Sequence, residues 1–278
     1  MKINLARSAG FCFGVKRAID IAVKIAKVKQ PVYMLGDLVH NEDVVRMLVR
    51  QGIRKIKDFT PHKKGILLLA AHGISANLLN QAKRYGYEVI DATCPMVKEI
   101  HKITINMDRR GYRIIIIGDK NHAEVAGIAG QIKSKSIIIE GINDLNKKGL
   151  NRIKKAAVVV QSTQDIEKVS HIKRILEKKI DDLKFFNTVC APTRIKQKEI
   201  RTLPKENDLI IVIGSKRSAN TKRLFQIAKS INKNTYWIQT KDEIKRHWFR
   251  NAKSVGITAG ASTPFESIKA VIRKIKGF

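Results

Sequence analysis

The sequence predicts an α/β protein built from three similar lobes. Short apolar runs, typical of buried strands, alternate with amphipathic segments of helical length along the 278 residues. This alternation favours parallel sheets, because a connecting helix must carry the chain back before the next parallel strand can start. A spacing that recurs after each of the three cysteines indicates that the pattern is repeated three times.

The apolar runs predict strands throughout the chain. They are Lys2–Leu5, Val32–Leu35, Ile66–Ala70, Glu88–Asp91, Arg113–Ile117, Ile137–Glu140, Ala157–Val160, Leu183–Phe186, Leu209–Ile213, Tyr236–Ile238 and Ser254–Thr258.

Helical periodicity is clearest over Ser75–Tyr85, Gln164–Lys179 and Pro264–Lys276. Pro264 suits the first position of the last of these helices, and Thr263 with Glu266 fits the pattern of a capping box. Pro95 likewise suits a helix start after Cys94. We therefore expect helices to begin directly after strand ends.

The repeat is measured from the cysteines Cys12, Cys94 and Cys190. A glycine that ends an apolar run follows each of them after 24 residues, at 36, 118 and 214. Four residues further come His40, His122 and Ser218, and two beyond those come Glu42, Glu124 and Asn220. We infer three quasi-equivalent lobes over 1–93, 94–189 and 190–278, the last with the C-terminal helix. A pseudo-threefold arrangement of these lobes would bring the cysteines together.

The composition of the chain argues against several classes of protein. Lys and Arg number 55 against 24 Asp and Glu, a formal charge of +31, and 44% of residues are hydrophobic. No apolar run is long enough to cross a membrane, and the N-terminal residues lack the core of a signal peptide. Three cysteines cannot form a disulfide framework. We therefore expect a cytoplasmic protein that is a monomer or a weak homodimer and does not bind membranes.

The positive charge has two interpretations. It reflects either the lysine-, isoleucine- and asparagine-rich usage of an AT-rich coding sequence or a field that attracts an acidic partner or anionic substrate. The basic residues are scattered, and aromatic residues make up only 6%. Nucleic-acid binding is therefore not expected, because a base-stacking surface needs gathered aromatic and basic side chains. A basic nucleic-acid-binding module remains an alternative.

Three convergent cysteines indicate a metal site of one of two kinds. An iron–sulfur cluster held by three thiolates would leave one iron open to a substrate. A zinc ion could instead take three thiolates with a histidine or water, in an enzyme acting on a phosphorylated small molecule. The third reading is that the three cysteines are buried thiols without a ligand.

Polar residues at the predicted strand ends form the second group of candidates. His40, His72 and His122 follow strands and suit contact with an anion or proton transfer near neutral pH. Glu124 is the carboxylate expected in a central cavity, where burial would let it act as an acid. Ser218, Asn220 and Ser262 lie at helix starts, whose N–H groups favour a phosphate or diphosphate.

The motifs AGFCFGVKRAI, LVHN, AAHGIS, DATCP, HAEV, QST, NTVC, SANTKRL and TAGASTP occur in this order between Ala9 and Pro264. Together they resemble the 4-hydroxy-3-methylbut-2-enyl diphosphate reductase family, the iron–sulfur enzymes of the last step of the non-mevalonate, or methylerythritol phosphate, isoprenoid pathway. The resemblance implies a trefoil of three α/β domains around a central cluster.

The resemblance also implies roles for individual residues. Cys12, Cys94 and Cys190 match the ligands of one [4Fe–4S] cluster per chain with one open iron. Glu124 matches the proton donor, and His122 is linked to proton delivery. The residues that match substrate contacts are His40, His72, His122, Ser162, Ser218, Ala219, Asn220 and Ser262.

The chain departs from the family pattern at several of these places. Ala219 stands where a serine is usual, Arg217 where an asparagine is usual, Ala123 where a proline is usual, and Ser162 where a threonine is usual. A lost neutral hydrogen bond is worth about 0.5–1.5 kcal/mol, so we expect these changes to lower affinity rather than to alter the reaction.

The implied reaction is reductive dehydroxylation of 4-hydroxy-3-methylbut-2-enyl diphosphate to isopentenyl and dimethylallyl diphosphate. No glycine-rich dinucleotide fingerprint follows a predicted strand, so no bound NAD or flavin is expected. Electrons would then come from a ferredoxin or flavodoxin, acidic carriers whose approach a basic surface would accelerate.

Overall fold

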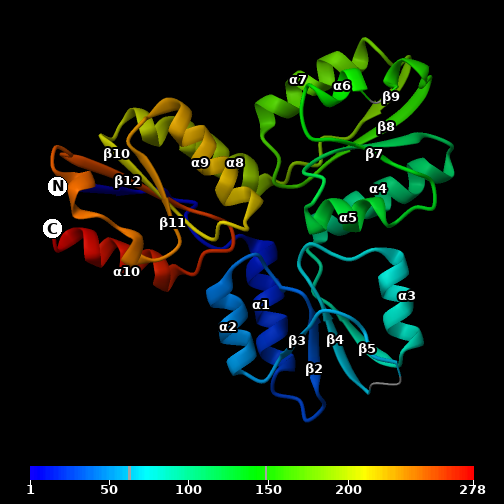
Figure 1. Ribbon diagram of the computed structural model, residues 1–278, viewed down its shortest axis with the longest axis horizontal. Coiled ribbons are helices and arrows are strands. Elements are labelled where there is room, and N and C mark those ends of the chain that lie inside the picture. Colours follow the sequence, from blue (N-terminus) through cyan, green and yellow to red (C-terminus); the bar gives the residue numbers. More distant parts are fainter. Residues whose placement is uncertain (62–63, 148) are drawn as a thin grey trace. The chain divides into compact units, whose positions relative to one another are not determined.

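The computed structural model describes residues 1–61, 64–147 and 149–278, and the strands of these residues form three four-stranded parallel sheets (Figure 1). The strand orders are β1-β12-β10-β11, β3-β2-β4-β5 and β7-β6-β8-β9. The predicted α/β class with three similar parallel sheets is confirmed.

The three sheets correspond strand by strand. One inner position is taken by β2 (Val32–Leu35), β6 (Arg113–Ile117) and β10 (Leu209–Ile213). The other is taken by β4 (Gly65–Leu69), β8 (Lys155–Val160) and β12 (Ser254–Ala259). The edges beside the first set are β3 (Arg54–Ile56), β7 (Ile137–Ile139) and β11 (Thr235–Ile238). The opposite edges are β5 (Tyr87–Asp91), β9 (Asp182–Phe185) and β1 (Lys2–Leu5).

The glycines of the repeat have one shared role in the sheets. Gly36, Gly118 and Gly214 directly follow β2, β6 and β10, and each N–H donates to the carbonyl of the last residue of the neighbouring edge strand. The acceptors are Ile56, Ile139 and Ile238, at 2.9 to 3.0 Å. The 24-residue spacing therefore marks equivalent positions in three equivalent sheets.

The pairing of the N-terminal strand differs from the expected boundary of the first lobe. Residues 2–5 were expected in the lobe 1–93, but β1 pairs in parallel with β12, with Lys2 opposite Ser254. It takes the edge that β5 and β9 take in the other sheets, which follow their inner strands directly along the chain. Local hydrophobicity identifies a strand but does not say which sheet it joins, so this pairing lay beyond the sequence pattern.

The chain forms two compact units. Unit 1 comprises Met1–Lys16, Val39–Met47 and Ala191–Phe278, and unit 2 comprises Arg17–Leu38 and Leu48–Cys190. The helix α1 spans Phe13–Ile25, and α2 spans Glu42–Arg50. None of the helices in the described ranges combines the length and hydrophobicity that a membrane crossing requires.

Unit 1 is a sheet covered on both faces. Alternate residues of β10 point to opposite sides, so Ile211 packs with Val271 of α10 (Phe265–Lys276), and Ile210 packs with Leu224 of α9 (Ala219–Ile231). Figure 1 shows α10 on the face opposite α8 (Ala191–Thr202) and α9. The single-turn helices η2 (Leu203–Lys205), η3 (Lys241–Glu243) and η4 (Arg246–Phe249) complete the unit. A strand buried on both faces explains the continuous apolar run at 209–213.

Unit 2 contains the other two sheets. Ile115 and Ile117 of β6 pack with α7 (Ile166–Glu177), whereas Ile114 and Ile116 pack on the side of α4 (Pro95–Arg109) and α5 (Ala123–Ala129). Figure 1 shows these two layers, with α6 (Asp144–Lys147) on the α7 side. Leu67 and Leu69 of β4 pack with Ala82 of α3 (Ala76–Arg84). The turn η1 covers Leu150–Arg152.

Several element ends differ from the sequence expectation. The strand β3 was not expected, because its three residues are mostly polar and exposed. Pro264 is the N-cap of α10 rather than its first residue, and the predicted capping box is wrong, because the Thr263 hydroxyl donates to Ile213 O at 3.1 Å. Pro95 does occupy the start of α4, as predicted.

The two sheets of unit 2 meet at a tight junction around Gly130. Ala76 N donates to Gly130 O at 3.0 Å, and the Gln131 amide donates to Ile74 O at 2.8 Å. A Cβ atom on Gly130 would lie 2.2 Å from Ser75 Cβ, far inside contact distance. Glycine is therefore required here by close approach of two backbone segments.

We expect Gly130→Ala to lower the free energy of unfolding by about 1–3 kcal/mol, because the added methyl group must push the two segments apart. Urea denaturation of the purified protein measures the change. Gly141→Ala is the matched control, since nothing lies within 4 Å of the added Cβ there. Equal stability of the two variants would show that the junction is loose.

Candidate functional site

The three cysteines have the same local geometry. Cys12, Cys94 and Cys190 carry thiols, are partly exposed and immediately precede α1, α4 and α8. The N–H of each donates to a carbonyl two residues beyond an inner strand: Cys12 to Ala261 after β12 (3.1 Å), Cys94 to Ala71 after β4 (2.9 Å), and Cys190 to Ser162 after β8 (3.0 Å). The predicted equivalence of the cysteines therefore extends to their backbone hydrogen bonds.

The chemistry of these residues fits an iron–sulfur ligand set. Thiolates are the usual ligands of such clusters, and a helix N-terminus favours the thiolate form. Over residues 1–61, 64–147 and 149–278, no three His, Cys, Asp or Glu side chains form a ready-made metal-binding group. The shared metal site of the three cysteines stays a prediction.

Glu124 and Ser162 form a buried pair in unit 2. Glu124 lies in the first turn of α5 with only 3% of its surface exposed. Its carboxylate accepts from the Ser162 backbone N–H at 2.6 Å and from the Ser162 hydroxyl at 2.8 Å. Hydrogen bonds to an ionised acceptor are short and strong, so they hold this carboxylate in one orientation. The structure thus brings together two of the candidate residues that the sequence named separately.

Ser162 also connects the carboxylate to a cysteine. Its side chain and N–H bind Glu124, while its carbonyl accepts the Cys190 N–H. Ser162 alone therefore sets the positions of the predicted acid and of a predicted metal ligand.

His122 is the N-cap of the same helix. Its Nδ1 accepts the Glu124 backbone N–H at 3.1 Å. A neutral His122 must therefore carry its proton on Nε2, which leaves that atom as the donor. Its place two residues before Glu124 suits the predicted part in proton delivery.

His72 follows β4 in the loop that holds Cys94. A Cβ on Gly127 of α5 would lie 3.5 Å from His72 O, so the helix that carries Glu124 packs against this loop. His72, Cys94, Glu124 and Ser162 consequently lie on connected segments of unit 2.

The start of α9 gathers three predicted residues in unit 1. Ser218 is its N-cap and accepts the Thr221 N–H at 3.3 Å, and Ala219 and Asn220 form its first turn. Asn220 is 4% exposed, and its amide nitrogen is buried without a hydrogen-bond partner. Buried polar atoms normally have partners, so this orphaned donor marks a place where an acceptor is expected to bind. An anion at a helix N-terminus would be such an acceptor.

Ser262 lies in the turn after β12. Its hydroxyl donates to His40 O at 3.0 Å, and the preceding Ala261 accepts the Cys12 N–H. This turn therefore joins the segments of three predicted site residues, His40, Cys12 and Ser262, within unit 1. Glu42, at the repeat position that Glu124 and Asn220 also occupy, instead accepts from the Ser215 hydroxyl at 3.0 Å.

Two residues that lie beside candidate site residues, Thr221 and His101, were not predicted as part of the site. The Thr221 hydroxyl is buried without a partner, against Gly260 and Gly214, where added Cβ atoms would lie 2.0 and 2.7 Å away. His101 packs on Gly73, which adjoins His72: a Cβ added to Gly73 would lie 2.8 Å from the His101 ring. Their spacing in the sequence is typical of ordinary helix residues, so only the packing reveals their places.

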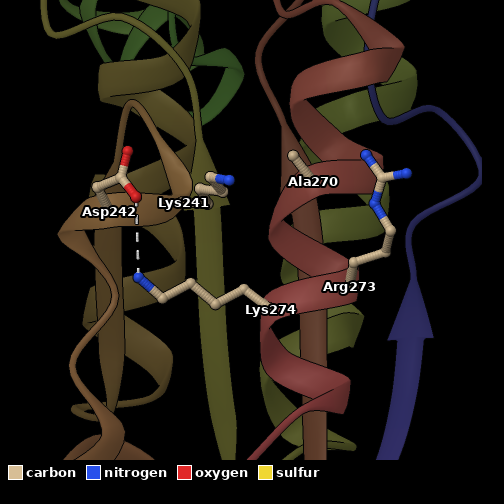
Figure 2. A pocket seen from close by; sticks show the side chains of 5 residues that line it. All are labelled: Lys241, Asp242, Ala270, Arg273 and Lys274. Atoms are coloured by element: carbon tan, nitrogen blue, oxygen red, sulfur yellow. Dashed lines mark ion pairs between the residues drawn. The ribbon is translucent and has the colours of Figure 1, made fainter.

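A surface hollow of about 410 Å³ lies elsewhere in unit 1, between η3 and α10 (Figure 2). Figure 2 shows Lys274 reaching toward Asp242 across it, with Nζ to Oδ1 at 4.0 Å. Its lining residues are Lys241, Asp242, Ala270, Arg273 and Lys274. None of them is a predicted site residue, and an exposed ion pair of this kind contributes little to stability.

The geometry defines an α/β protein with a fixed buried carboxylate and, at the start of α9, a buried amide donor without a partner. The model of the LytB protein family matches residues 3–276. Proteins named 4-hydroxy-3-methylbut-2-enyl diphosphate reductase are similar over nearly their whole length. The one from Geobacter metallireducens is 37% identical over 99% of this chain and 97% of its own, and the one from Campylobacter hominis is 41% identical over 99% and 98%.

Solved structures show the same likeness. That of the E-1-hydroxy-2-methyl-but-2-enyl-4-diphosphate reductase from Plasmodium falciparum is 31% identical, with a TM-score of 0.92 over 98% of this chain and 87% of that one. A second, described as the terminal enzyme of the non-mevalonate pathway, is 35% identical with a TM-score of 0.70 over the full length of both chains. The chain belongs to the LytB protein family and is a reductase of the isoprenoid pathway.

Burial makes His101 sensitive to acid. Loss of hydration lowers its pKa from 6.5 to about 4, against a smaller opposing effect of Asp91. Since the unfolded chain takes up this proton at a higher pH than the folded protein, the free energy of unfolding must fall as the pH drops from 6.5 toward 4. We expect His101→Gln to remove up to about 3 kcal/mol of this loss.

Urea midpoints measured between pH 7 and pH 4 test this expectation. His171→Gln, at an exposed position on α7, is the control. Parallel pH profiles for the wild type and His101→Gln would contradict it.

Proposed function

We propose that this chain reduces 4-hydroxy-3-methylbut-2-enyl diphosphate to isopentenyl diphosphate and dimethylallyl diphosphate. The observation that carries the proposal is the Ser162 arrangement, in which one residue binds the buried Glu124 carboxylate and the Cys190 backbone. An acid beside a cysteine ligand is what a reductive loss of hydroxide requires. The names of the relatives supply the substrate.

The diphosphate is assigned to the start of α9 and its surroundings. Ser218, Asn220 and Ser262 are assigned as its side-chain contacts, for which the Ser262 hydroxyl would turn away from His40 O, and Ala219 contributes only its backbone N–H. The buried Asn220 amide nitrogen without a partner supports this assignment. His40, His72 and His122 are assigned to the same substrate, as donors to its anionic end.

Cys12, Cys94 and Cys190 are assigned as the ligands of one [4Fe–4S] cluster per chain. Their common attachment to strand-end carbonyls supports equal roles. When bound, such a cluster supplies single electrons and a Lewis-acidic iron.

Glu124 is assigned as the acid. The overall reaction uses two electrons and two protons: the carbon–oxygen bond breaks, the hydroxyl leaves as water with one proton, and the second proton ends on an allylic carbon. Protonated Glu124 supplies the proton that makes water the leaving group. Ser162 holds the carboxyl group in place, and the Nε2 proton of His122 offers a route for its reprotonation.

A ferredoxin or flavodoxin is assigned as the electron donor, in the cytoplasm, with no bound NAD or flavin. A formal charge of +31 suits an acidic carrier and predicts encounter rates that fall with salt. The active form is assigned as a monomer or weak homodimer.

Anaerobic purification followed by iron and sulfide analysis tests the proposal. We expect a brown protein with about four irons and four sulfides per chain, and turnover of the hydroxylated diphosphate with a reduced viologen dye. A colourless protein that binds only zinc after anaerobic reconstitution would overturn the reductase mechanism.

We expect Glu124→Gln to lower kcat about a hundredfold or more, because the amide keeps the shape of the side chain but has no proton to give. Iron content and substrate binding should be retained. The measurement is viologen oxidation at saturating substrate. Near-normal turnover would remove Glu124 from the acid role.

Asn220→Ala is the contrasting control. It should raise KM with little change in kcat, because it removes a binding contact rather than the acid. A change confined to iron content would contradict the assignment of Asn220 to the diphosphate.

A further inference from the structure

Lys196 is a buried cation held entirely by backbone carbonyls in unit 1. It lies on α8 and is 2% exposed. Its Nζ donates to the carbonyls of Ser8, Gly10 (3.0 Å) and Ala259 (3.2 Å). These three bonds use the full donor capacity of an ammonium group.

All three acceptors belong to segments that hold Cys12. Ser8 and Gly10 lie just before Cys12, and Ala259 is the last residue of β12. Two residues after Ala259, the carbonyl of Ala261 accepts the Cys12 N–H at 3.1 Å. The Lys196 ammonium therefore ties the cysteine loop to the strand end on which Cys12 rests.

Glu199 adds a second attachment from the same helix. Its carboxylate accepts from the Ser8 backbone N–H at 3.0 Å and from the Ser8 hydroxyl. Residues three apart share a face of a helix, so Lys196 and Glu199 lie side by side and both bind the loop.

Burial makes the charge of Lys196 costly. Desolvation lowers the pKa of Lys196 to about 8, against smaller opposing effects of Cys12 and Glu199. The ammonium is thus still mostly protonated at neutral pH. A buried ammonium that binds only carbonyls is costly, so a role beyond packing is expected of it.

We propose that Lys196, supported by Glu199, is a positioning residue for Cys12: its hydrogen bonds fix the loop 8–12 to the end of β12. This inference rests on the proposed function, in which Cys12 is a cluster ligand. The hydrogen bonds of Lys196 and Glu199 to the loop 8–12 and to β12, called the clasp below, form in the protein without metal.

Amide hydrogen exchange of the metal-free full chain tests the clasp. Lys196→Met keeps the apolar stem but removes the charge and all three donors. We expect exchange in the segment 8–13 to become about tenfold faster or more, because local opening no longer breaks these bonds. Lys198→Met, an exposed lysine on the same helix, is the matched control and should exchange like the wild type. Unchanged exchange in Lys196→Met would overturn the proposal.

Iron loss to a chelator tests the role toward Cys12 separately. After anaerobic reconstitution, we expect Lys196→Met to lose iron about tenfold faster than the wild type and Lys198→Met. Lys196→Arg, which keeps the charge and several donors, should restore part of the difference. Faster amide exchange with unchanged iron loss would overturn the positioning role. If the wild type takes up no iron, the proposed function fails, while the exchange result on the metal-free chain still decides the clasp.

If circular dichroism shows that Lys196→Met does not fold, Glu199→Gln provides a second test of the clasp. Loss of the charged acceptor should weaken both bonds to Ser8. We expect faster exchange of the 8–13 segment in this variant, and unchanged exchange would overturn the proposal.

Discussion

The hydrogen bond from each cysteine N–H to a strand-end carbonyl is the constraint on which the site residues depend. The three acceptors lie two residues beyond β4, β8 and β12, the equivalent inner strands of the three sheets. The same loops carry His72, Ser162 and Ser262. Because the strands are parallel, each cysteine is tied to the end of a sheet at which ligands of such folds bind.

Equivalent positions of the three repeats hold side chains with different chemical properties. The slot six residues beyond each repeat glycine holds Glu42, Glu124 and Asn220. Glu42 is engaged by Ser215, Glu124 is buried against Ser162, and Asn220 keeps an unpartnered amide donor. The three equivalent positions therefore have different partners, although the sheets that carry them correspond strand by strand.

Exposed ion pairs contribute little to the stability of the folded state. The ion pairs Arg46–Asp43 and Lys173–Glu177 are largely exposed, and such pairs add little stability. Lys196 is different, because its charge is buried and its partners are carbonyls of the Cys12 segments. The surface charge is therefore no main source of stability, whereas the buried charge of Lys196 fixes the segments around Cys12.

The sequence by itself determined the α/β class, the threefold repeat and most strands, and it supplied the candidate site residues, because apolar periodicity and the spacing from each cysteine are local properties. It did not determine that β1 completes the C-terminal sheet, that Thr263 bonds to Ile213 rather than capping α10, or that Lys196 lies under the Cys12 loop. These depend on contacts between residues far apart in the chain, which only tertiary packing decides, because burial and hydrogen-bond partners are set by what the folded chain brings together.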